Sequence, residues 1–134
     1  MKEFSMRPGM QTLAGTFYPT GHAVVMFPQE QQARQAAEAL MAEGFSDDDV
    51  ELLRPDVVLR EVLAATPDEA DGLPSVGTEA ATARTLGDLA RQGHYGLLVA
   101  VNDAKAAERL MTVARRLHFS AAQRYRHLVI EELS

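Results

Sequence analysis

Two apolar segments of this chain begin with side chains that could carry chemistry. His22 opens the segment 22–27, and His94 directly precedes the segment 95–101, which opens with Tyr95. Imidazole titrates near neutral pH, binds metals and transfers protons. If the two segments form neighbouring strands, His22 and His94 could approach each other and form a ligand site with Tyr95. Two unrelated histidines at the edge of a sheet are the alternative.

A second candidate site is an arginine-rich region near the C-terminus. Residues 109–134 carry five Arg and two Glu, a balance of +3, whereas residues 1–108 carry 8 basic and 17 acidic residues, a balance of −9. Arg124 and Arg126, with Arg115 and Arg116, could bind an anion, because the guanidinium fork suits phosphate and carboxylate. The alternative is that these charges complement a helix dipole and protect an edge strand.

Acidic and nucleophilic residues give weaker signals. The run 47–49 is three aspartates, but it lacks the spacing and glycine of a calcium loop, which favours a solvated turn. Glu79 and Asp88 are too far apart along a predicted helix to act as a carboxylate pair. The chain has no cysteine and no short histidine pair. We therefore expect no catalytic set, no metal site and no cofactor.

Composition sets the broad class. The chain has 134 residues, a net charge of −6 and 46% hydrophobic residues, which describes one soluble domain. No apolar run approaches the roughly 20 residues that span a bilayer. The negative charge argues against general binding to nucleic acid or membranes. We expect a cytoplasmic protein whose residues 1–21 form a flexible N-terminal leader.

The elements that would position the candidate residues occur in two similar halves. The first half predicts a strand over 22–27, a helix over 29–43 that ends at Gly44, and a strand over 50–53. The second predicts a strand over 95–101, a helix from Asn102 or Asp103 to Leu117, and a strand over 124–132.

The two halves repeat at a constant offset of 74 positions. Ala33 corresponds to Ala107, and the turn Phe45-Ser46 corresponds to Phe119-Ser120. A duplicated β-α-β unit predicts an α+β, ferredoxin-like domain over 22–134, with two helices on a four-stranded antiparallel sheet. The segment 55–93 is an insertion, with helical patterns over 55–65 and 79–92 and a loop over 66–77.

The order of these elements resembles the YflT-type heat-induced stress protein domain, a bacterial general-stress family. Three stretches carry the resemblance: the strand, helix and acidic turn up to Val50, the polar helix that ends at Gly93 before an apolar strand, and the helix 103–117 that leads into the last strand. The resemblance covers about residues 22–132. It implies a stress-related or regulatory role without catalytic residues.

We therefore expect a non-enzymatic stress-related or regulatory interaction domain. An aliphatic sheet face predicts a homodimer through that face. The alternative is a small-ligand sensor, or an enzyme, that uses His22, His94, Tyr95 and the arginines at 124 and 126. A third hypothesis is nucleic-acid binding through the arginine patch.

Overall fold

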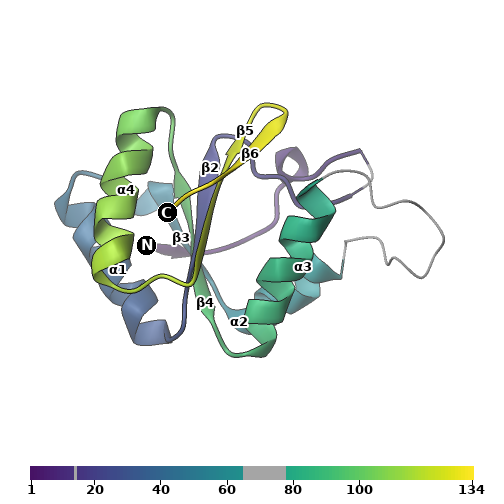
Figure 1. The fold of residues 1–134 in the computed structure, drawn as a ribbon, viewed down its shortest axis with the longest axis horizontal. Coiled ribbons are helices and arrows are strands. Elements are labelled where there is room, and N and C mark those ends of the chain that lie inside the picture. The colour runs from purple at the N-terminus through teal and green to yellow at the C-terminus, as the bar shows by residue number, and fades with distance from the viewer. Residues whose placement is uncertain (14, 65–77) are drawn as a thin grey trace.

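The computed structural model describes residues 1–13, 15–64 and 78–134, which form a mixed α+β fold (Figure 1). In these residues, four α-helices accompany one six-stranded sheet. The elements in chain order are β1 (Lys2–Glu3), η1 (Pro8–Met10), β2 (His22–Phe27), α1 (Glu30–Ala42), η2 (Asp47–Asp49), β3 (Val50–Leu53), α2 (Pro55–Val57), the π-helix η3 (Val58–Leu63), α3 (Thr78–Arg91), β4 (Tyr95–Ala100), α4 (Ala104–Arg116), β5 (Ala121–Arg126) and β6 (Val129–Glu132).

The strand order of the sheet is β1-β3-β4-β2-β5-β6. All neighbouring strands are antiparallel except β1 and β3, which are parallel. The expected four-stranded sheet is corrected to six strands, because β1 and β6 extend its two edges. The strand predicted over 124–132 is instead a hairpin. Its turn lies at His127 and Leu128, where Leu128 adopts a left-handed φ of 65° without a glycine to announce it.

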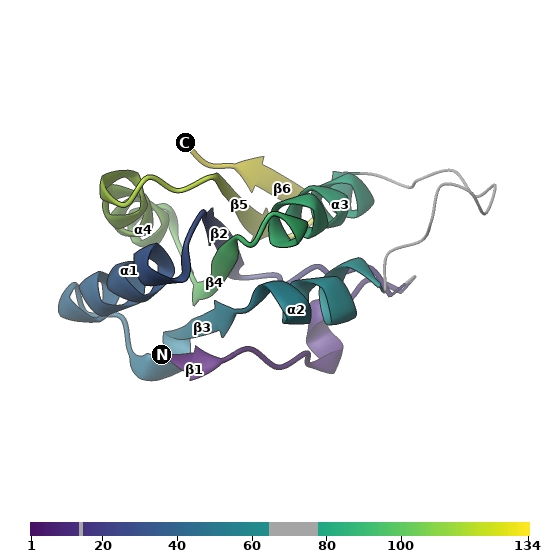
Figure 2. The same ribbon diagram turned by 90° about the horizontal axis from the view of Figure 1, so that it is seen from below.

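Helices cover both faces of the sheet, which Figures 1 and 2 show from two directions. Alternate strand residues point to opposite faces, so each strand contributes to two cores. One face packs against α1 and α4, with a core that includes Val25, Phe27, Leu40, Leu97 and Leu110. The other packs against η3 and α3, with a core that includes Val24, Met26, Val62, Leu86 and Leu98. The sequence predicts an aliphatic sheet face that would contact a second subunit. In the structure, the insertion of the same chain covers this face.

Local signals in the sequence explain where the two main helices begin and end. Gln29 and Gln32 form a capping box at the start of α1. At its end the backbone N–H of Phe45 donates to Leu40 O at 3.1 Å, with Gly44 at a φ of 104°, which confirms the predicted glycine ending. Asp103 caps α4 by accepting a hydrogen bond from Ala106 N at 2.8 Å. The predicted loop over 66–77 lies outside the described residues.

The N-terminal segment, predicted as a flexible leader, packs on the insertion side of the sheet. Phe17 is completely buried, and Phe4 is 7% exposed. The Phe17 ring meets those of Phe4 and Tyr125 edge to face, with centroids 6.0 and 5.9 Å apart. Strand β1 pairs Lys2 with Glu51 at the sheet edge. This segment therefore supplies part of the second core.

Candidate functional site

A groove of about 610 Å³ lies between helix α3 and the C-terminal hairpin. Figure 2 shows α3 beside β6, with β5 next to it. Small side chains of α3, including Ala81, form one wall, and β5 and β6 form the floor. Among the described residues that line the groove, none is a lysine or an arginine. Its polar lining residues are Thr82, Thr85, Ser120, Gln123, Glu132 and Ser134.

Gln123 is the buried polar residue of this groove. Its side chain is 2% exposed, although it lies on a strand among apolar neighbours. Its amide Nε2 donates to Glu132 Oε2 at 3.5 Å, a long hydrogen bond by which the orientation of the amide is assigned. Its Oε1 is buried and receives no hydrogen bond from any described residue. A buried acceptor without a donor costs roughly 1–3 kcal/mol, so such groups often have a functional reason.

His94 contacts a residue that lines the same groove. A hydrogen bond of 2.8 Å joins His94 Nδ1 to Ser120 Oγ, and Ser120 also donates its backbone N–H to Met26 O at 2.7 Å. Ser120 lines the groove, whereas His94 is not among its lining residues. The structure therefore places one of the predicted histidines at the margin of the groove, through a serine.

His22 is not near His94, which corrects the predicted proximity of the two histidines. Strands β2 and β4 are neighbours but antiparallel, so His22 lies opposite Ala100 and Phe27 lies opposite Tyr95. The two histidines are therefore six residue steps apart along the strands (100 − 94), about 20 Å at 3.4 Å per residue. His22 Nδ1 instead contacts Thr20 O at 3.0 Å. A shared site of His22 and His94 does not form.

Tyr95 belongs to the opposite face of the sheet from the groove. It packs against the core under α1 and α4, while its neighbour Gly96 faces the insertion. Burial raises the pKa of the Tyr95 phenol, and the nearby Glu30 carboxylate raises it further. Tyr95 and His94 are adjacent in sequence, but alternation along the strand directs their side chains apart.

Two of the four arginines in the predicted patch, Arg115 and Arg124, are engaged through their side chains in contacts within the chain. Arg124 is 13% exposed and pairs with Glu131 at 3.9 Å. Arg115 contacts Glu108 at 3.1 Å and donates to Ser134 O at 2.8 Å. Arg126 is exposed, and its backbone O accepts a hydrogen bond from Tyr18 Oη at 2.6 Å. Neither Arg124 nor Arg126 lines the groove.

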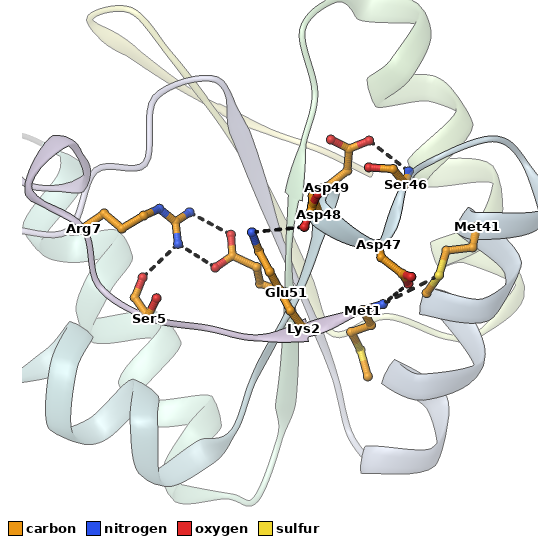
Figure 3. Close-up of polar contacts among 10 residues, drawn as sticks. All are labelled: Met1, Lys2, Ser5, Arg7, Met41, Ser46, Asp47, Asp48, Asp49 and Glu51. Atoms are coloured by element: carbon orange, nitrogen blue, oxygen red, sulfur yellow. Dashed lines mark hydrogen bonds and ion pairs between the residues drawn. The ribbon is translucent and has the colours of Figure 1, made fainter.

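The acidic turn 47–49 binds the N-terminal segment (Figure 3). Asp49 and Ser46 form a capping box, and Asp47 accepts a 2.5 Å contact from the Met1 amino group. Lys2 lies 3.9 Å from Asp48. In the described part of the chain, no group of three or more His, Asp or Glu side chains is arranged to hold a metal ion.

An ion pair that sequence reasoning missed lies beside this turn. Arg7 donates from Nη1 and Nη2 to the two carboxylate oxygens of Glu51, each at 2.8 Å (Figure 3). Glu51 is only 2% exposed, and it raises the pKa of the Arg7 guanidinium. A carboxylate inside the buried strand 50–53 was the one sequence signal that a basic partner must cover it. The 44 positions between the two residues concealed which one.

Comparison with known proteins leaves the family open. None of the described helices is long and apolar enough to cross a membrane. Comparisons of this chain with protein-family models, with curated proteins and with solved structures give no match.

Proposed function

We propose that this chain is a non-enzymatic regulatory interaction domain that binds its partner in the groove between α3 and the C-terminal hairpin. The observation that carries the proposal is Gln123, a buried amide whose Oε1 has no donor among the described residues. Oε1 is buried below the groove surface, so a partner reaches it only if binding shifts the Gln123 side chain. A hydrogen bond donated there would then remove the cost of the unpaired acceptor. Hydroxyl, amide and carboxylate groups in the groove are suited to holding such a partner.

A ferredoxin-like architecture and a stress-related role are part of the same proposal. The strand order β3-β4-β2-β5 supports the architecture, because β2-α1-β3 and β4-α4-β5 are then two interleaved β-α-β units. The resemblance to the heat-induced stress protein domain supports the role. The homodimer stays a prediction. With both sheet faces covered by helices, a dimer would use an edge or a helix surface.

A small-ligand sensor is the second candidate, favoured by the contact between His94 and Ser120 at the end of the groove. It shares the site with the first candidate and differs in the size of the occupant. The groove volume of about 610 Å³ suits either a small molecule or one or two side chains of a bound segment.

Blocking the groove tests the proposal. Thr85 is exposed on α3 and lines the groove, and its Oγ1 donates to the carbonyl four residues earlier at 3.1 Å. Thr85→Arg should fill the groove without disturbing the core. Thr112→Arg on α4 is the matched control, because Thr112 is also exposed and makes the same contact to Glu108 O at 3.0 Å.

The assay is protein-detected NMR against a mixed set of short peptides and small polar compounds. We expect shifts of the amides of Ser120, Gln123 and Glu132 in the unsubstituted chain and in Thr112→Arg, and their loss in Thr85→Arg. Binding that survives in Thr85→Arg, or shifts confined to another surface, would refute the proposed site.

A further inference from the structure

We propose that the occupant of the groove is an extended basic peptide segment, which adds to β6 as a further strand and places a lysine or arginine side chain beside Glu132. This inference rests on the proposed function and specifies its partner. Three features of the described residues carry it: the free edge of β6, the charge of the groove, and the space beside α3.

The first feature is the outer edge of β6. It lies at the end of the strand order, and no described segment pairs with its outer side. In an antiparallel pair, hydrogen-bonded and non-hydrogen-bonded positions alternate. The backbone N–H of Leu133 donates to Ala122 O at 2.9 Å, so position 133 points inward to β5. By alternation Ile130 and Glu132 direct their N–H and C=O groups outward, ready for another strand.

The second feature is charge. Ile130 and Glu132 also face the groove with their side chains, so a strand paired to them would extend side chains over the same space. Glu132 is exposed, and the lining of the groove, within the described part of the chain, includes no basic residue. Glu132 Oε2 accepts from the buried Gln123 amide at 3.5 Å, and the exposed carboxylate keeps the capacity to accept from further donors. The acceptors match the several N–H donors of a lysine or arginine side chain.

The third feature is the width of the groove. The α3 wall presents alanine and threonine, which leave room beside the floor of the groove. The β-sheet edge supplies backbone hydrogen bonds, and the adjacent groove selects the side chain. In recognition by strand addition, backbone hydrogen bonds typically provide affinity and side-chain pockets provide specificity.

A second copy of this chain is a poorer occupant than a basic segment. If β6 paired with β6 of another copy, registers centred on residue 131 or 132 would place identical glutamates opposite each other. Like charges directly opposite destabilise a strand pair. The acidic edge therefore disfavours self-pairing and favours a strand of the opposite charge.

The test uses three peptides and one small amine. The probe is the acetylated, amidated heptapeptide Ser-Val-Lys-Val-Lys-Val-Ser, whose lysines share one face of a strand. In one control the lysines become glutamates, and in the other the backbone nitrogens of both lysines are methylated, which removes the N–H donors that face β6. Agmatine supplies an ammonium and a guanidinium group without a peptide backbone.

We expect the lysine peptide alone among the three to bind, with slowed amide exchange at Ile130 and Glu132 and intermolecular contacts to β6 by NMR. Glu132→Gln should weaken binding about two- to fivefold, the upper part of the range for one exposed ion pair. Glu131→Gln is the matched control, because the same charge is removed from the other face of the strand. It should leave affinity within about twofold, since its carboxylate pairs with Arg124 instead.

Other outcomes separate the two proposals. If agmatine shifts the groove amides and the peptides do not, the strand addition is refuted and the groove remains a small-ligand site. If the glutamate or N-methylated peptide binds as well as the lysine peptide, the basic strand is refuted. If every probe leaves the groove amides unshifted, the basic strand is refuted, and the proposed function then stands or falls with the wider Thr85→Arg comparison.

Discussion

The ion pair between Arg7 and Glu51 makes the strongest stability prediction for this fold. Glu51 is 2% exposed on β3, and both of its oxygens are held at 2.8 Å by the Arg7 guanidinium. Arg7 belongs to the N-terminal segment and is 40% exposed. Arg7→Met retains most of the aliphatic stem but removes the charge. The substitution leaves a carboxylate in the sheet without its partner.

The expected cost follows from this burial. Removing one partner of a buried pair typically costs about 3–5 kcal/mol. Water can partly replace the half-exposed Arg7 side chain, so we expect about 2–3 kcal/mol. A domain of this kind is stable by about 5–15 kcal/mol, so the loss is a large fraction of the total. The double substitution Arg7→Met with Glu51→Leu should return the free energy of unfolding to within about 1 kcal/mol of the original.

Urea unfolding followed by far-UV circular dichroism measures this, since the chain has no tryptophan for fluorescence. Arg54→Met is the matched control. Arg54 pairs with Glu3 at 2.5 Å, but both side chains are exposed, at 38% and 59%. We expect no resolvable change from that control. If Arg7→Met and Arg54→Met have the same effect, or the double variant is less stable than Arg7→Met, the explanation from a buried carboxylate is refuted.

Three further predictions concern the backbone and one buried phenol. Gly44→Ala should destabilise the chain by about 1–2 kcal/mol, since a left-handed position disfavours a Cβ; a thermal unfolding curve that does not move would contradict this. Leu128→Gly should stabilise it by about 0.5–1 kcal/mol, because Leu128 is left-handed and 85% exposed; urea unfolding with a lower midpoint than the original would count against the hairpin turn. Burial raises the pKa of Tyr125 above its ordinary value of 10.0. The unfolded phenol therefore loses its proton first, and the stabilisation is complete below pH 10 and declines as pH rises further, by about 1.4 kcal/mol per unit for one proton. Tyr125→Phe should remove this part of the slope; an unchanged alkaline slope in unfolding experiments would show that Tyr125 titrates normally.

Local structure was largely predictable, because its signals are local. The apolar run 22–27, the helical spacing of Ala33 and its neighbours, and Gly44 after them lie within a few residues of each other. The single strand over 124–132 was wrong for the opposite reason. Leu128 adopts a turn conformation that its side chain disfavours, and the hairpin geometry imposes it.

The candidate site was harder to predict, because it depends on which segments meet. Sequence reasoning selected His94, which contacts the groove through Ser120, but also His22, which lies at the other end of the sheet. The two strands are neighbours, as predicted, but they are antiparallel. Their first residues, and with them His22 and His94, therefore lie at opposite ends of the strand pair. The sequence did not predict Gln123 or Glu132 as site residues, because a single glutamine and a single glutamate match no binding or catalytic motif.

By itself the sequence determined the α+β class, the repeated β-α-β order and the caps of the helices, since periodicity and capping are read within a few residues. Only the tertiary structure decided what covers the sheet and where its edges are. The insertion and the N-terminal segment fill the second face, Arg7 finds Glu51 across 44 positions, and the hairpin leaves β6 free beside α3. These outcomes depend on burial and strand pairing between distant segments, and the apolar pattern of each segment alone fits several partners.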